Sequence, residues 1–418
     1  MKILIVTQYF WPEFFIVNDM VKTLVRQGHT VKVLTGKPNY PDGDVFDGYE
    51  ESGLEHEDYN NASIFRVPLR PRKSGGAKNL FLNYLSFIYN GLRYFPSEIK
   101  GEAYDSIIVF APSPITSALP ALYLKYKTKA HLAIWVQDLW PESLKATGFI
   151  KNKYLLRIIG LLVRAIYAGS DTLMVQSRLF FAPVSNYASS DKIIYFPNAY
   201  PDDFSVSMQM EETNEILSSK GLIDTLENNF CVTFAGNLGT AQSLNTLISA
   251  AQKLIGIKNL RIVLVGSGSK VNWLSEQIKD RNLHNVILAG QFPSSVMPEI
   301  FSRSQALLVS LNKDDIFSFT IPGKVQAYLA SGRPIIGCLD GEGARIIDEA
   351  GAGLTCPAED VDGLVAVIKE VISMSISDRA ALGVAGRKYF LKNFEMNQLC
   401  IHLIDILNMR IKIAKVKA

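Results

Sequence analysis

The stretch FCVTFAGNLGTAQSL, residues 230–244, decides the fold class. Its first six residues are mostly apolar, and the run ends at once in a loop built from Gly, Asn and Thr. The segment LRIVLVGSG, residues 260–268, repeats the pattern after one amphipathic helix. Short apolar runs that end in small residues and alternate with amphipathic helices are typical of parallel βαβ units. The second half of the chain is therefore predicted to form a parallel sheet covered by helices.

The first half of the chain shows the same alternation. The segments KILIVTQY (2–9), YDSIIVFAP (104–112) and AHLAIWVQD (130–138) read as strands, with amphipathic helices between them. Two such series within 418 residues predict an α/β protein with two Rossmann-like domains that face each other across a cleft.

Domain boundaries follow from where the alternation stops. We expect a first domain over residues 1–200 and a second over residues 228–395. The polar stretch 201–227 has no strand pattern and reads as a linker. The helix predicted over 396–418 is expected to cross back and join the first domain.

Composition narrows the class of protein. Apolar residues make up 48% and charged residues 20% of the chain, and the net charge is +3, so nothing indicates a nucleic-acid partner. The cysteines are far apart, which favours reduced thiols in the cytoplasm over disulfides or a zinc site. No uniform apolar run reaches the roughly 20 residues of a membrane span, and the short N-terminal run reads as a strand rather than a signal peptide.

The segment IPGKVQAYLASG, residues 321–332, places a lysine in the first turn of a predicted helix. A positive charge there is unfavourable, because it opposes the helix dipole. A bound anion would offset this cost, because it would interact favourably with the dipole, the backbone N–H groups and the ammonium group at once. The loops with Gly236 and Gly266 would bring further backbone N–H groups to the same edge of the sheet. We therefore expect a diphosphate site around Lys324. The alternative is a solvated lysine at a frayed helix end.

Polar and aromatic side chains follow the strands of the first domain. The segments QYFWPE (8–13), GKPNYP (36–41) and VQDLWPES (136–143) combine carboxylates and amides with aromatic rings, which suits sugar binding. The alternative is that Trp11 and Trp140 are core residues. His131 lies inside an apolar strand and reads as structural, and no metal-ligand spacing stands out. The candidate acceptor ligands are Glu13, Asn18, Lys37, Tyr40 and Glu142.

Two segments concentrate positive charge among apolar residues. Residues 66–100 contain seven Lys or Arg and one acid, and residues 145–164 contain five basic residues and no acid. Basic amphipathic segments suit an anionic membrane surface, and ordinary solvated helix faces are the alternative. We expect contact with the cytoplasmic face of the inner membrane.

The motifs taken together resemble a GT-B glycosyltransferase of family 4, and in particular the bacterial surface-polysaccharide branch with L-fucosamine and fucosyl transferases. The resemblance runs in order along nearly the whole chain. It is carried by QYFWPEFFIVND (8–19), GHTVKVLTGKPNYPDG (28–43), VQDLWPESLKATG (136–148), FAGNLGTAQSL (234–244), LVGSGS (264–269), IPGKVQAYLASGRPII (321–336) and GLTCPAED (353–360).

This resemblance implies a retaining transferase that moves a sugar from a nucleotide diphosphate donor to a polyprenyl-diphosphate-linked glycan in O-antigen or capsule synthesis. The donor implied is UDP-linked, with an N-acetyl amino sugar of the L-fucosamine type, and no metal or other cofactor is implied. Matched to the family, Gly236, Asn237 and Lys324 fall near the donor diphosphate. Gly266, Gln291 and Phe292 fall at the nucleoside pocket, and Asp138 falls at a position that is often polar and catalytic.

The chain departs from the family pattern at several positions. The two glutamates usual around the Lys324 helix are Ser318 and Gln326 here, and both stay candidates for donor binding. Asn237 and Gln242 stand where Arg and Lys are usual. These differences keep open a non-catalytic nucleotide-sugar-binding or scaffold protein. A GT-B nucleotide-sugar epimerase is a further alternative.

Overall fold

The chain folds into two compact units. In the computed structural model, unit 1 consists of Met1–Ala199 and Met396–Ala418, and unit 2 consists of Tyr200–Glu395. The prediction of two parallel-sheet α/β domains is confirmed. The structure describes residues 1–73, 76–202, 210–219 and 221–417.

The sheet of unit 1 has the strand order β3-β4-β2-β1-β5-β6-β7-β8. Its strands run parallel except for β3, which pairs antiparallel with β4 at one edge. Parallel strands buried on both faces read as continuous apolar runs, as this chain does. The strands are β1 (Lys2–Thr7), β2 (Thr30–Gly36), β3 (Glu55–Tyr59), β4 (Ala62–Val67), β5 (Ser106–Ala111), β6 (His131–Val136), β7 (Thr172–Val175) and β8 (Ile193–Tyr195).

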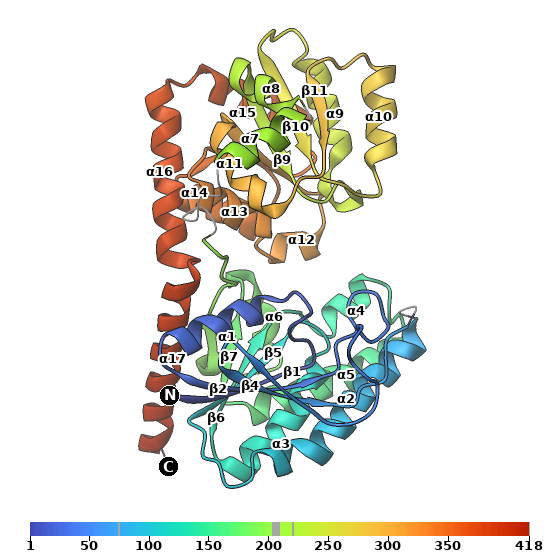
Figure 1. Cartoon of the computed structure of the whole chain (residues 1–418), viewed down its shortest axis with the longest axis vertical. Helices are drawn as coiled ribbons and strands as arrows, with labels where there is room; N and C mark the ends of the chain where they lie inside the picture. The colour runs from blue at the N-terminus through green and yellow to red at the C-terminus, as the bar shows by residue number, and fades with distance from the viewer. Residues whose placement is uncertain (74–75, 203–209, 220, 418) are drawn as a thin grey trace. The chain divides into compact units, whose positions relative to one another are not determined.

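Helices cover both faces of this sheet (Figure 1). One face carries α1 (Ile16–Arg26) and the C-terminal α17 (Met396–Lys417), which lie side by side. Leu403 and Leu407 of α17 are fully buried in the core beside β1 and β2, which is the return to the first domain that the sequence analysis expects. The remaining helices are α2 (Ala77–Glu98), α3 (Ala118–Thr128), α4 (Glu142–Ala146), α5 (Lys153–Gly169) and α6 (Phe181–Ser185).

The hairpin of β3 and β4 is a feature that the sequence analysis did not predict. Strand β3, EHEDY, alternates between half-buried and exposed residues and carries no apolar run. Asn60 and Asn61 form its turn with φ of 50° and 67°. Left-handed conformation at both turn residues matches the twist of a two-residue hairpin, and Asn tolerates it well.

The sheet of unit 2 is parallel throughout, with the order β11-β10-β9-β12-β13-β14. Central strand β9 lies between β10 and β12. The chain adds β10 and β11 on one side of β9 and then β12, β13 and β14 on the other, so the order of strands reverses here. Ligands of such sheets bind at the carboxyl edge near this point. The strands are β9 (Phe230–Ala235), β10 (Leu260–Val265), β11 (Val286–Gly290), β12 (Ala306–Ser310), β13 (Ile335–Cys338) and β14 (Gly353–Cys356).

Helices also occupy the expected linker. Within 201–227 the structure places α7 (Met210–Ser219) and the start of α8 (Leu222–Asn228), while residues 203–209 and 220 lie outside the described part. Leu217, Leu222 and Leu226 are buried in the core of unit 2, so this part of the stretch belongs to that unit. The other helices of unit 2 are α9 (Leu244–Lys253), α10 (Val271–Asp280), α11 (Met297–Arg303), α12 (Asp315–Phe319), α13 (Gly323–Ser331), α14 (Glu342–Ala350), α15 (Val361–Ser373) and α16 (Ile376–Asn393).

Across the described residues of both units, none of the helices combines the length and the apolar character needed to cross a bilayer.

Candidate functional site

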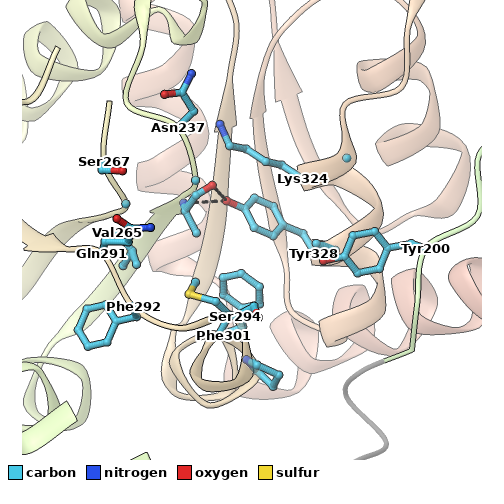
Figure 2. A pocket seen from close by; sticks show the side chains of 17 residues that line it. Tyr200, Asn237, Val265, Ser267, Gln291, Phe292, Ser294, Phe301, Lys324 and Tyr328 are labelled. Atoms are coloured by element: carbon cyan, nitrogen blue, oxygen red, sulfur yellow. Dashed lines mark hydrogen bonds between the residues drawn. The ribbon is translucent and has the colours of Figure 1, made fainter. Parts of the chain in front are cut away.

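A cavity of about 600 Å³ opens at the carboxyl edge of the unit 2 sheet. The ends of β9 and β10 and the loop after β11 form one side, and α11 and the start of α13 form the other (Figure 2). The cavity lies at the turns after β9 and β10, close to the point where the strand order reverses. Open parallel sheets bind their ligands near this point.

Two glycine turns line this cavity. Gly236 has φ of 122° and Gly266 has φ of 137°, a region of backbone space that favours glycine. A Cβ atom on Gly266 would lie 1.9 Å from the carbonyl oxygen of Gly236, so the turns after β9 and β10 touch directly. The N–H of Gly236 donates to Val265 O at 2.9 Å. Glycine at these positions lets backbone N–H groups approach a ligand closely.

Lys324 reaches into the cavity from the first turn of α13, as predicted (Figure 2). Its Nζ atom donates a hydrogen bond to Oε1 of Gln242 and lies 4.1 Å from the centre of the Phe234 ring. Within the described part of the chain, no carboxylate pairs with it. The ammonium group therefore faces the cavity without a counter-charge.

The surroundings of Lys324 disfavour its charged form. Burial lowers the pKa of Lys324 from 10.5 to about 7. A neutral amide and an aromatic ring only partly replace the lost water. An anion in the cavity would reverse this shift, because it would pair with the ammonium group and with the N–H groups at the start of α13.

Tyr328, one turn further along α13, fixes the end of β9. The N–H of Ala235 donates to the Tyr328 hydroxyl at 2.9 Å, and this side chain is almost fully buried (Figure 2). Because Ala235 precedes Gly236, this bond couples α13 to the first glycine turn. Nothing in the sequence indicated this bond, since a tyrosine on a buried helix face gives no signal of where its hydroxyl points.

The other predicted donor ligands divide into two groups. Asn237, Gln291 and Phe292 line the cavity with Gly236, Gly266 and Lys324. Ser318 and Gln326 do not line it. The hydroxyl of Ser318 donates to Asp315 O within α12 at 2.7 Å, and Gln326 is buried on α13. The donor role of all these residues stays a prediction.

In unit 1, Glu13 ties together the loops that follow β1 and β2. Its carboxylate accepts hydrogen bonds from the N–H groups of Phe10 at 3.0 Å, Asn39 at 2.9 Å and Tyr40 at 2.8 Å. Burial raises the pKa of Glu13 to about 7, and these N–H donors oppose the shift. Asn18 is buried beside it and donates to Glu13 O at 2.6 Å. Both side chains hold the loops in place.

Lys37 and Tyr40 occupy different environments. Lys37 is buried and forms an ion pair with Glu55. Tyr40 is partly exposed, and its ring lies 4.9 Å from the guanidinium group of Arg72. Glu142 lies at the start of α4 and accepts a hydrogen bond from the Tyr187 hydroxyl at 2.9 Å.

Asp138 lies just after β6 and is held by its neighbours. It accepts a hydrogen bond from Trp140 Nε1 at 3.1 Å, and burial raises its pKa against the opposing bonds from Ser143, Ser113 and Trp140. Burial raises the pKa of Tyr84; the charge of Arg72 opposes this shift and the charge of Asp138 adds to it. Arg72, which lies over the rings of Tyr9 and Tyr40, thus joins this polar cluster. Its place in the basic run 66–100, for which membrane contact is expected, gave no signal of this position.

Comparison with known proteins shows what the region around the cavity is similar to. Residues 229–374 match the family model described as glycosyl transferases group 1. The matched region lies within unit 2 and spans less than half of the chain. The chain is 22% identical over 291 residues to the probable glycosyltransferase WbjE of Pseudomonas aeruginosa, covering 69% of this chain and 70% of WbjE. It is 22% identical over 407 residues to the putative colanic acid biosynthesis glycosyl transferase WcaI of Escherichia coli, covering 93% and 96%.

Solved structures show which fold both units of this chain share. A glycosyltransferase from Rickettsia africae aligns over 98% of both chains with a TM-score of 0.71 and 14% identity. HepE from Anabaena, solved in complex with UDP, aligns over 98% of this chain and 100% of its own, with a TM-score of 0.67 and 12% identity. The GT-B fold prediction is confirmed. At these identities the likeness concerns the fold alone.

Proposed function

We propose that the protein transfers a sugar from a nucleoside diphosphate donor, with the donor diphosphate bound at Lys324 and the turn of Gly236. The observation that carries this proposal is the Lys324 ammonium group, which faces a cavity of about 600 Å³ without a carboxylate partner among the described residues. The group 1 domain that spans this cavity supports the same reaction class.

Lys324 would act on the leaving group. As the glycosidic bond of the donor breaks, negative charge builds on the departing diphosphate, and a cation already in place stabilises it together with N–H groups. Removal of one such group typically lowers kcat by about 10²–10³. Gln291 and Phe292, at the β11 side of the cavity, are proposed to receive the nucleoside.

The donor is proposed to be UDP-linked. HepE, whose structure was solved with UDP, shares the fold of this chain and supports that choice. The L-fucosamine type of sugar rests on the sequence resemblance. We propose retention at the anomeric carbon, with the leaving phosphate accepting the proton of the acceptor hydroxyl. A covalent sugar intermediate trapped on Asp138 and located by mass spectrometry would contradict this step.

The acceptor is proposed to be a polyprenyl-diphosphate-linked glycan, recognised by unit 1. WcaI is named for colanic acid biosynthesis, which supports a role in surface-polysaccharide assembly. Asp138 and the loops held by Glu13 supply the polar groups for acceptor binding. The basic segments 66–100 and 145–164 are proposed to place the protein on the cytoplasmic face of the inner membrane.

The first test is thermal-shift binding of UDP, GDP, ADP and TDP to wild type, Lys324→Met and Lys270→Met. Lys270 is a matched control, because it lies over the Trp273 ring and outside the cavity. At about 100 Kd, a nucleotide should stabilise the wild type by roughly 2.7 kcal/mol. We expect one nucleotide, UDP, to stabilise wild type and Lys270→Met but not Lys324→Met.

Two results would contradict the proposal. If no nucleotide stabilises the wild type, or if Lys324→Met responds equally, then the cavity is not a diphosphate site. Binding of a UDP-sugar without transfer to any lipid-linked acceptor would instead favour the scaffold alternative.

A further inference from the structure

A second groove, of about 560 Å³, lies in unit 1 between α4 and α5. Pro141, Gly160 and Tyr187 are among the residues that line it. A Cβ atom on Gly160 would lie 3.3 Å from Cε1 of Tyr187 and 3.9 Å from Cγ of Pro141. The absence of a side chain at residue 160 therefore leaves room above these rings.

Three cations line this groove: Lys145 from α4, and Arg157 and Arg164 from α5. Arg157 and Arg164 are seven residues apart and so lie on one face of the helix, roughly 10 Å apart along its axis. Arg164 donates one hydrogen bond to Asn186 O at 3.1 Å. None of the three forms an ion pair with any acid in the described ranges.

One acid also lines the groove, and it is already engaged. Glu142 accepts the Tyr187 hydroxyl at 2.9 Å. Three cations against one carboxylate leave an excess of two positive charges, which matches a diphosphate better than a sugar or a carboxylic acid.

An exposed apolar stripe continues from the groove along α5. Tyr154, Ile158 and Leu161 are 75%, 62% and 65% exposed, although the opposite face of the helix is buried through Val163 and Ile166. The spacing of four and then three residues places the exposed side chains in one row over roughly 10 Å. A helix with a second apolar face in solvent is typical of contact with a lipid chain or a partner.

We propose that this groove binds the diphosphate of a polyprenyl-diphosphate acceptor, with its first isoprene units lying along Tyr154, Ile158 and Leu161. The inference rests on the proposed function, which names that class of acceptor. It adds the site on the chain where this acceptor binds. Cations next to an apolar row match an amphiphile whose charged end joins directly to a hydrocarbon. Glu142 begins α4 four residues after Asp138, so the groove lies beside the loop assigned to the acceptor.

The test measures binding of farnesyl diphosphate, a short prenyl diphosphate, by isothermal titration calorimetry. All variants carry Lys324→Met, so that binding at the unit 2 cavity does not contribute. We expect Arg157→Gln/Arg164→Gln to weaken farnesyl diphosphate binding at least about tenfold, as expected for lost charge-assisted hydrogen bonds. Lys127→Gln/Lys129→Gln is the charge-matched control, because these cations lie over rings of α3 and should leave binding unchanged.

The apolar row is tested separately. Ile158→Ser/Leu161→Ser should weaken farnesyl diphosphate binding at least about tenfold and leave binding of inorganic diphosphate unchanged. Ile376→Ser/Val384→Ser, at exposed apolar positions of α16, is the matched control. Circular dichroism spectra of each variant establish that it is folded.

Three outcomes would overturn the proposal. Inorganic diphosphate could bind as tightly as farnesyl diphosphate, which indicates a free-anion site. Phosphatidylglycerol vesicles could bind in an Arg157- and Arg164-dependent way while farnesyl diphosphate does not, which indicates a general membrane surface. The double arginine variant could also match its control. The donor site is tested separately, by the UDP thermal shift of the protein that retains Lys324. Failure of the farnesyl diphosphate experiments therefore does not count against the donor site.

Discussion

At the scale of single residues, Lys324 places an unfavourable positive charge at a helix start, and this cost is the reason to predict a ligand site there. Its positive charge at a helix start was visible in the sequence and indicated an anion. The partners that set its chemistry were not visible. Gln242 and Phe234 lie 82 and 90 residues away in the chain, and only the fold brings them to the ammonium group. Spacing along the sequence predicts an edge of a sheet but not which neutral groups surround a charge there.

The depressed pKa of Lys324 predicts proton uptake on nucleotide binding. With a pKa of about 7, the free protein at pH 8 is mostly neutral at this residue. A bound diphosphate raises the pKa, so roughly 0.9 proton should be taken up at pH 8 and roughly 0.1 at pH 6. Calorimetry of UDP binding in buffers of different ionisation enthalpy measures this number directly. Lys324→Arg should take up none, because guanidinium stays charged. Equal heats in all buffers at pH 8 would contradict the prediction.

At the scale of elements, strongly patterned segments were predictable and polar ones were not. The strands β9 and β10 and the helix α13 follow from their apolar periodicity and their glycine ends, and the structure places them as expected. Strand β3 was missed because an edge strand with one solvated face needs no apolar run. Helices α7 and α8 were missed because only single leucines, such as Leu217 and Leu226, mark their buried side.

The contact between the turns after β9 and β10 gives a prediction at this scale. Gly266→Ala adds a Cβ atom 1.9 Å from Gly236 O at a φ of 137°, so both turns must move. We expect a loss of about 1–3 kcal/mol of unfolding free energy from strain and a weaker UDP thermal shift. Urea unfolding checks the first and thermal shift the second. Gly256→Ala is the control, because nothing lies within 4 Å of its Cβ position. Equal stability of the two variants would contradict the close contact.

At the scale of the whole molecule, the chain builds unit 1 from its two ends and inserts unit 2 between them. Helix α17 supplies Leu403 and Leu407 to a core that contains Ile3 and Val33, whereas the cores of unit 2 consist of residues between 217 and 394. Separate cores predict that a perturbation in one unit leaves the other intact. The sequence allowed this topology to be proposed, because its last amphipathic helix follows the final strand of the second series.

Substitution in α17 tests this separation of cores. Leu403→Ala removes a fully buried side chain from unit 1 and should cost about 2–5 kcal/mol there. Ile401→Ala, at an exposed position of the same helix, should stay within about 0.5 kcal/mol of wild type. In differential scanning calorimetry, Leu403→Ala should lower the transition of unit 1, and UDP should raise that of unit 2 in wild type and variant alike. If UDP and Leu403→Ala instead shift one common transition, then the two cores unfold together and the units depend on each other for stability.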